Sequence, residues 1–185
     1  TIFGKCISGG YPMAGGVGGR RDVMLGFASG IGGKSGERAY VGGTLSANPL
    51  SCAAGYFALL EMERTGAPAL AGKAGDRLTA GLAGIIDRHQ LPYVAYNQGS
   101  IVHLECSGAM SFDFSSMSFI KSALGLLSNK AMMTRRKDSM ERMGAAYMAN
   151  GIVTLAGSRL YTSLADTDEV IADALTRFET VFSHV

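Results

Sequence analysis

One lysine stands among glycines near the start of the chain, in residues 4–24 (GKCISGGYPMAGGVGGRRDVM). Glycines let a backbone approach a ligand more closely than larger residues allow. A lysine amine attacks an aldehyde only when it is neutral, so such chemistry needs a site that lowers the amine pKa. Lys5 is therefore the first candidate for chemistry. The alternative is a solvated lysine in a glycine loop.

A second segment, residues 42–49 (GGTLSANP), could bind an anion. Gly42, Gly43 and Thr44 offer unhindered N–H groups and one hydroxyl just ahead of a helix start, and a phosphate group needs such donors. The alternative role of the Thr44 hydroxyl is to cap the turn beside Asn48. Ser46 and Asn48 are expected to be structural.

In order and spacing, the two segments resemble the class III (subgroup II) pyridoxal-phosphate aminotransferases, most closely the glutamate-1-semialdehyde aminomutase-like branch. That family carries a GK-x-I-x-GG-x-P-x-GA-x-GGR segment, then GTLSGNP, then a helix of small residues. The resemblance implies an α/β fold, the fold type I of pyridoxal-phosphate-dependent transferases. It also implies that this chain is the C-terminal portion of a longer enzyme, whose N-terminal half carries the other cofactor contacts.

The resemblance implies roles for three residues. Lys5 would form the Schiff base with pyridoxal 5'-phosphate and then move a proton between the substrate carbon and the cofactor. Thr44, with Gly43, would bind the phosphate of the neighbouring subunit's cofactor. That arrangement would make the enzyme a homodimer with shared active sites.

Arg159 is a third candidate, because several relatives carry an arginine at this place and bidentate arginines bind substrate carboxylates. In those relatives two prolines and a leucine follow the arginine. Here Thr162 and Ser163 replace the prolines, and the aminomutase branch lacks the arginine. Asp166 stands where many relatives carry histidine. The alternative for Arg159 is a surface or interdomain arginine of the small domain.

Periodicity and capping signals predict the elements that position these residues. Residues 1–3 are expected to end a buried strand, and residues 4–10 to turn with Lys5 at the tip. Residues 15–19 suit either a close backbone approach or a tight strand pair, and residues 20–27 a short helix. Asn48 and Pro49 predict a helix start. The helix is expected to run to Arg64 and to end at Gly66. Its small face, Ala53, Ala54 and Ala58, would allow close packing, and Leu50, Phe57 and Leu60 would form an apolar stripe.

The rest of the chain alternates helices and strands. Helices are expected over residues 68–89, 118–127 and 138–150, with strands over 93–96, 100–106, 152–155 and 160–163. A last helix is expected after Thr167, with an apolar stripe of Val170, Ile171, Ala174, Leu175, Phe178 and Phe182. We place a domain boundary near Leu91-Pro92. Residues 1–90 would complete a large cofactor domain, and residues 91–185 would form a small α+β domain.

Composition narrows the function classes. The formal net charge is +2 and no basic cluster exceeds residues 135–137, which argues against nucleic acid. No long apolar span appears, so we expect a soluble cytoplasmic protein without a membrane segment. The three cysteines form no CxxC pair, and no residue spacing predicts a metal site. Residues 30–35 look like the end of a P-loop, but Ala28 stands where that motif needs glycine.

The expected reaction is the transfer of an amino group between an amine or amino acid and an oxo-acid or aldehyde. An alternative with the same chemistry is intramolecular transfer, as in the aminomutase. From another class, the chain could be a non-catalytic fragment that acts as an interaction module.

Overall fold

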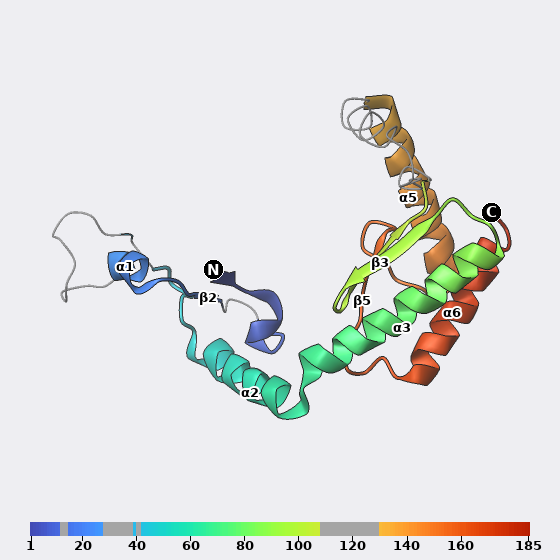
Figure 1. Ribbon diagram of the computed structural model, residues 1–185. Coiled ribbons are helices and arrows are strands. Elements are labelled where there is room, and N and C mark those ends of the chain that lie inside the picture. Colours follow the sequence, from blue (N-terminus) through green and yellow to red (C-terminus); the bar gives the residue numbers. More distant parts are fainter. Residues whose placement is uncertain (12–14, 28–38, 40–41, 108–129) are drawn as a thin grey trace. The chain divides into compact units, whose positions relative to one another are not determined.

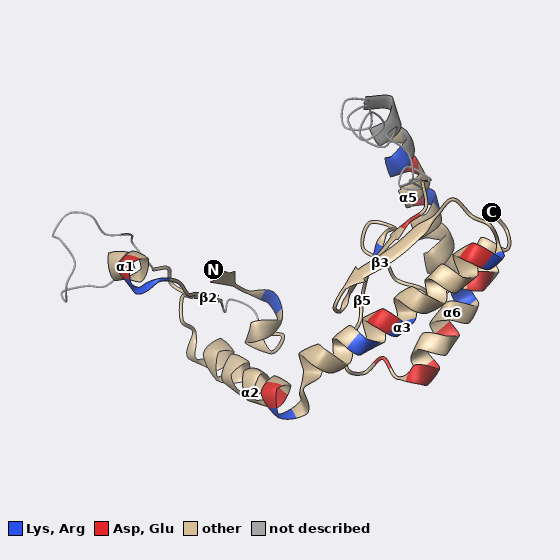
Figure 2. Ribbon diagram, in the orientation of Figure 1, with Lys and Arg blue, Asp and Glu red and all other residues tan. Residues whose placement is uncertain are grey.

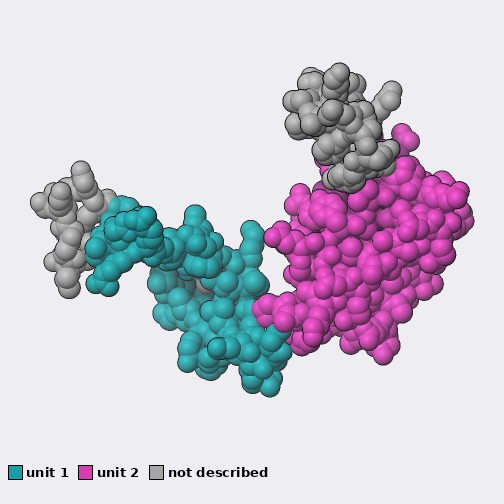
Figure 3. Space-filling model, viewed as in Figure 1, with its two compact units in different colours: residues 1–66 teal, residues 67–185 magenta. Residues whose placement is uncertain are grey.

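The computed structural model describes residues 1–11, 15–27, 39, 42–107 and 130–185 of the 185-residue chain. The contacts within the chain divide it into two compact units, Thr1–Gly66 and Ala67–Val185 (Figure 3). The assignment of residues 1–90 to a large cofactor domain stays a prediction, because contacts within this chain alone do not test it.

The first unit begins with a two-stranded antiparallel ribbon, in which β1 (Ile2–Phe3) pairs with β2 (Gly16–Val17). A Cβ atom at Gly15 would lie 3.0 Å from the Phe3 carbonyl oxygen, and one at Gly18 would lie 3.1 Å from the Phe3 ring. The close strand pair predicted for residues 15–19 is therefore confirmed. The predicted burial of the first strand is wrong: among the described residues β1 pairs with the two residues of β2 alone, and Ile2 is 86% exposed.

The short helix predicted over residues 20–27 is present in two parts, α1 (Arg21–Met24) and the 3-10 turn η2 (Leu25–Phe27). Asp22 lies in its first turn. The Asp22 carboxylate accepts hydrogen bonds from Arg20 Nε at 3.1 Å and Arg20 Nη2 at 2.7 Å.

Helix α2 (Pro49–Thr65) begins and ends as predicted. Asn48 Oδ1 accepts hydrogen bonds from the N–H groups of Leu50 at 3.0 Å and Ser51 at 3.3 Å. Gly66 ends the helix with a left-handed φ of 63°. Charged residues occur only toward its C-terminal end (Figure 2).

The expected apolar stripe of α2 is wrong as a buried stripe, since Leu50 is 62% exposed and Phe57 68% exposed. The helix packs through its small residues against the turn of residues 5–8, and its buried positions are Ser51 and Gly55. Close approach of another backbone to this helix requires small side chains, so the apolar ones point elsewhere.

The second unit holds the hydrophobic core. Helices α3 (Ala67–Arg88) and α6 (Asp168–Phe182) run side by side (Figure 1). Helix α5 (Lys130–Ala149) packs against α6. The helix predicted over residues 68–89 corresponds to α3, which buries Ala74, Leu78, Leu82 and Ile85 at helical spacing, whereas Leu70 is 45% exposed. In α6, Thr167 accepts the capping bond from the Val170 N–H group at 3.5 Å, but Val170 itself is exposed. The largest fully buried side chains are those of Tyr147, Phe178, Phe182, Leu82, Leu104 and Val102.

A three-stranded antiparallel sheet completes this unit, in the order β3 (Val94–Gln98), β4 (Ile101–Glu105) and β5 (Arg159–Tyr161). The strands predicted over residues 93–96 and 100–106 correspond to β3 and β4, which pair as a hairpin. Its turn lies at Gly99 and Ser100, where Gly99 has a φ of 57°, rather than at residues 97–99, because Asn97 and Gln98 belong to β3. Side chains alternate between the two faces of a strand. One face carries the buried residues Val102, Leu104 and Leu160 toward the helices.

The strand predicted over residues 152–155 is wrong. Only Leu155 makes a bridge, to Arg159, and the chain then turns through Ala156 and Gly157, whose φ angles are 53° and 70°. Ile152 is buried, whereas Val153 is 79% exposed and Leu155 51% exposed. Of the apolar residues in this short run, Ile152 is therefore the one that packs into the core. The strand predicted over 160–163 corresponds to β5.

Helix α5 begins at Lys130, earlier than predicted, and the chain leaves it through Gly151, whose φ is 76°. The helix expected over residues 118–127 lies outside the described residues. The P-loop-like residues 30–35 lie outside them too.

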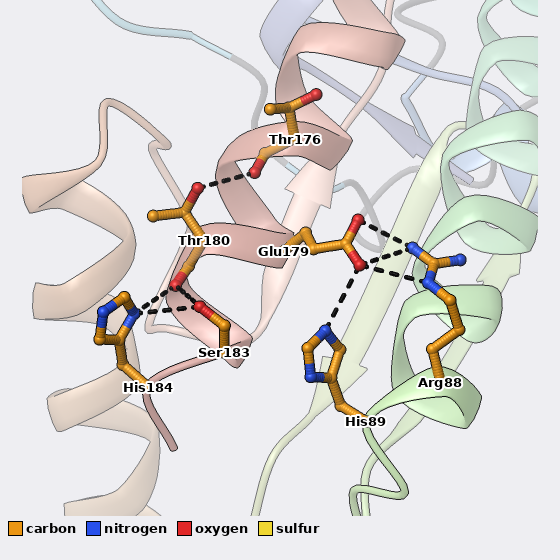
Figure 4. A network of polar contacts seen from close by, with 7 residues as sticks. All are labelled: Arg88, His89, Thr176, Glu179, Thr180, Ser183 and His184. Atoms are coloured by element: carbon orange, nitrogen blue, oxygen red, sulfur yellow. Dashed lines mark hydrogen bonds and ion pairs between the residues drawn. The ribbon is translucent and has the colours of Figure 1, made fainter.

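A polar network links the C-terminal ends of α3 and α6 (Figure 4). Arg88 Nη2 donates to both carboxylate oxygens of Glu179 at 2.8 Å, and His89 Nε2 lies 3.4 Å from Glu179 Oε1. The hydrogen bonds from Arg88 are the main reason that the pKa of Glu179 is lowered. Because these side chains are largely exposed, water screens the ion pair.

Across the described part of the chain, every helix is too short or too polar to cross a membrane.

Candidate functional site

Lys5 lies where the sequence predicts, at the exposed turn directly after β1. It opens the 3-10 turn η1 (Lys5–Ser8), and its own backbone has a φ of 63°. That left-handed conformation is uncommon for residues with a side chain and costs about 1–2 kcal/mol. The Ser8 hydroxyl donates to the Lys5 carbonyl oxygen at 3.1 Å and closes the turn. The amine is thus presented by a strained and locally fixed backbone.

The turn η1 is held by close contact with α2. A Cβ atom at Gly55 would overlap the Ile7 carbonyl oxygen, and one at Gly9 would lie 3.0 Å from the Ala54 carbonyl oxygen. Ser8 and Ser51 are both buried at this contact. The glycines of the lysine segment and the small residues of α2 therefore allow a close contact between η1 and α2, and this contact sets the position of Lys5.

Gly43 and Thr44 lie in the turn ahead of α2, where the Ser46 N–H group donates to the Gly43 carbonyl oxygen at 3.0 Å. The helix cap is provided by Asn48 and not by Thr44. Within the described residues, the exposed Thr44 hydroxyl has no hydrogen-bond partner. A shallow hollow of about 390 Å³ opens beside Gly43, Thr44 and Ser46. These groups suit a phosphate, which accepts from N–H and hydroxyl donors.

The two predicted segments meet within the first unit. A larger hollow of about 710 Å³ is lined by Ile2, Phe3 and Val17 of the ribbon and by Ser46, Ala47 and Cys52 of the second segment. Its lining is mainly apolar, which suits the flat or hydrocarbon part of a small molecule. The first unit thus combines an exposed amine, a turn whose N–H and hydroxyl groups suit an anion, and an apolar surface.

Arg159 belongs to the second unit, where it is exposed on strand β5. It lies opposite His103 in the sheet register. Its guanidinium forms no ion pair with any described residue. The structure brings the Lys5 and Thr44 segments together in one unit, and it does not place Arg159 relative to them.

Two features of the second unit were not anticipated from the sequence. The buried Glu105 carboxylate accepts from Arg136 Nε at 2.6 Å and from the Ser107 N–H group at 3.0 Å. Burial opposes ionisation of Glu105, but the hydrogen bonds from Ser107 and Arg136 outweigh it and lower its pKa. Cys106 Sγ lies 3.0 Å from Tyr147 Oη, and burial raises the pKa of this thiol to about 12.

A signal for the first of these features exists in the sequence. Glu105 alternates with His103 and Ile101 along one strand, as a half-polar face does. Its partner Arg136 lies 31 residues away, a separation that no local pattern can bridge.

Among the described residues, no cluster of three or more His, Cys, Asp or Glu side chains is placed to hold a metal ion.

Several known proteins are similar to this chain, over part or all of its length. It is 30% identical over 188 residues to glutamate-1-semialdehyde 2,1-aminomutase 2 of Shouchella clausii (strain KSM-K16), which covers 100% of this chain and 38% of that protein. It is 34% identical over 123 residues to glutamate-1-semialdehyde 2,1-aminomutase 1 of Macrococcus caseolyticus (strain JCSC5402), covering 65% of this chain and 27% of that protein. No family model matches the chain.

A solved structure shows the same fold. The crystal structure of an omega-transaminase from Sphaerobacter thermophilus matches with a TM-score of 0.73 at 24% identity, over 98% of this chain and 37% of that one. The predicted α/β fold is therefore confirmed. The chain spans less than two fifths of the length of these proteins and corresponds to the C-terminal part of the sequence relatives.

Proposed function

This chain belongs to the class III pyridoxal-phosphate aminotransferase family, and we propose that it supplies the C-terminal part of an enzyme that transfers an amino group. The substrates would be an amine or amino acid and an oxo-acid or aldehyde. The single observation that carries the proposal is Lys5, presented at an exposed, strained turn that α2 holds in place.

Lys5 is proposed as the Schiff-base lysine of the enzyme. When bound, pyridoxal 5'-phosphate supplies an electron sink for the carbon whose bond is broken. The chain contributes a primary amine whose backbone is fixed by the Ser8 hydrogen bond and by the contact of η1 with α2. With the cofactor bound, the Lys5 amine would accept the proton of the substrate carbon and return it.

Gly43 and Thr44 are proposed to hold the cofactor phosphate. Their support is the unpartnered Thr44 hydroxyl, among the residues that the structure covers, and the cap that Asn48 provides in its place. By the resemblance, the bound phosphate belongs to the neighbouring subunit's cofactor. We therefore propose a homodimer with shared active sites. We also propose that the enzyme acts in the cytoplasm.

Arg159 is proposed to bind a substrate carboxylate. It is exposed and forms no ion pair with the described residues, and a guanidinium matches a carboxylate with two parallel hydrogen bonds. Intramolecular transfer is a second candidate, because the sequence relatives are named as glutamate-1-semialdehyde aminomutases. Assays with glutamate-1-semialdehyde and with separate amino donors and acceptors would tell the two reactions apart.

Replacement of Lys5 in the full-length protein tests the proposal. Lys5→Ala should lower amino transfer by several orders of magnitude, since both the covalent attachment and the proton transfer depend on the amine. Lys73→Ala is the matched control, because Lys73 is an exposed lysine on α3 in the other unit. Equal turnover of Lys5→Ala and the control would overturn the enzyme assignment and favour a non-catalytic interaction module.

A further inference from the structure

A row of three side chains crosses the outer face of the sheet. Tyr96 on β3 lies opposite His103 on β4, and His103 lies opposite Arg159 on β5. Because neighbouring residues of a strand point to opposite faces, these three share the face that is turned away from buried Val102 and Leu104. Residues from three separate parts of the sequence therefore lie side by side.

His103 and Arg159 are a close pair. The Leu104 N–H group donates to the Ser158 carbonyl oxygen at 2.8 Å, and the Thr162 N–H group donates to the Ser100 carbonyl oxygen at 2.9 Å. These bonds alternate along an antiparallel ladder, so the pair of His103 and Arg159 falls between them as a non-hydrogen-bonded pair. Side chains of such pairs approach each other most closely.

Tyr96 fixes the His103 ring. The two rings are stacked, with centroids 4.9 Å apart and an interplanar angle of 5°. One face of the imidazole is covered by Tyr96 of β3, so its other face is turned toward β5, on which Arg159 is the register partner of His103. Within the described part of the chain, the ring nitrogens of His103 have no hydrogen-bond partner.

The Arg159 guanidinium is not paired with the acid on the same face of β4. Glu105 is next on the same face of β4, but its carboxylate is occupied by Arg136 and Ser107. Arg159 is exposed, and Tyr161, two residues along β5, is 57% exposed and adds an aromatic surface. The face therefore offers a guanidinium, a fixed imidazole and an aromatic ring to a ligand.

We propose that Arg159 and His103 form one binding site for a planar carboxylate, in which Tyr96 is a positioning residue for His103. The guanidinium would bind both carboxylate oxygens, a geometry that it matches better than an ammonium does. The imidazole would donate to one of these oxygens, and Tyr161 would lie against the flat remainder of the ligand. The inference rests on the carboxylate role proposed for Arg159 and extends it to His103, Tyr96 and the ligand class.

The test is a titration of the purified protein with benzoate, followed by the ring resonances of His103 in an NMR spectrum. Benzoate should shift these resonances saturably at millimolar concentrations, because the face is open rather than enclosed. Benzamide has the same ring without the charge and should bind at least tenfold more weakly. The titration needs no cofactor, so an absence of benzoate binding would not bear on the role of Lys5. Likewise, full activity of Lys5→Ala would not bear on benzoate binding.

Variants complete the test. Arg159→Gln should weaken benzoate binding about tenfold or more, His103→Asn should weaken it several-fold, and Arg142→Gln, an exposed arginine on α5, should leave it unchanged. Tyr96→Ala should weaken benzoate binding, whereas Tyr96→Phe should bind benzoate as the parent protein does, because the ring alone positions His103. A circular dichroism spectrum equal to that of the parent protein shows that each variant is folded.

Two results would overturn the inference. One is binding of benzoate and benzamide with equal affinity, which would mean adsorption of an aromatic ring. The other is benzoate affinity unchanged in folded Arg159→Gln.

Discussion

At the scale of single residues, Lys5 and Thr44 are supported in different ways. The backbone of Lys5 adopts a left-handed conformation that few non-glycine residues adopt, and such strain concentrates at functional sites. The support for Thr44 is a hydroxyl that the described residues leave unsatisfied, while Asn48 caps the helix. The sequence predicts both residue types at these places but not the strain, which depends on how η1 packs on α2.

Removal of the Thr44 hydroxyl should weaken cofactor binding. A hydrogen bond to a charged group contributes about 1.5–3 kcal/mol, so Thr44→Ala should raise the dissociation constant of pyridoxal 5'-phosphate about 10- to 100-fold. Thr44→Ser keeps the hydroxyl and is the control. Dialysis followed by cofactor absorbance measures the difference, and equal retention by Thr44→Ala and the parent would contradict the assignment.

At the scale of elements, the position of the lysine turn depends on glycine. Gly55→Ala would place a methyl group against the Ile7 carbonyl oxygen, so η1 or α2 must shift. Overpacking of this kind costs about 1–3 kcal/mol, although alanine is the better helix former. The free energy of unfolding, measured with denaturant, should fall by that amount.

Gly84→Ala is the matched control for Gly55→Ala, since a Cβ there meets only the flexible end of Arg88 at 3.7 Å. It should stabilise α3 by about 0.5–1 kcal/mol. If Gly55→Ala is as stable as Gly84→Ala, the described contact between η1 and α2 is wrong.

The buried Glu105 carboxylate should make stability depend on pH. Its folded pKa is lowered from 4.5, so its contribution is fully present above pH 4.5 and is lost as the pH falls through the folded pKa. Glu105→Gln should therefore destabilise the protein at pH 7, where it removes the charge that pairs with Arg136. The measurement is the difference in free energy of unfolding between the two proteins from pH 7 to pH 3. That difference should shrink below pH 4.5, and a constant difference would contradict this account.

Local signals predicted the element ends well and the burial of faces less well. Asn48, Gly66, Gly151 and Thr167 mark element boundaries in both sequence and structure, because capping is decided within a few residues. The exposed stripe of α2 and the missing strand at 152–155 show the limit. Burial depends on which surface packs against the element, and that surface comes from distant residues.

At the scale of the whole molecule, the core and the candidate catalytic lysine lie in different units. The buried cluster of the described residues belongs to the second unit, whereas Lys5, Gly43 and Thr44 belong to the first. The first unit leaves Ile2, Leu50 and Phe57 exposed. The alignment with relatives more than twice as long explains why the sequence could indicate the cofactor but not the substrate, since the chain carries only part of such a protein.

The most direct test of the central claim is to incubate the protein with pyridoxal 5'-phosphate, reduce it with borohydride and map the modified peptides by mass spectrometry. The account predicts a phosphopyridoxyl group on the peptide that contains Lys5, with no comparable label on the exposed control Lys73 and none in Lys5→Ala. Labelling of Lys73 and other surface lysines with Lys5 left unmodified would contradict it.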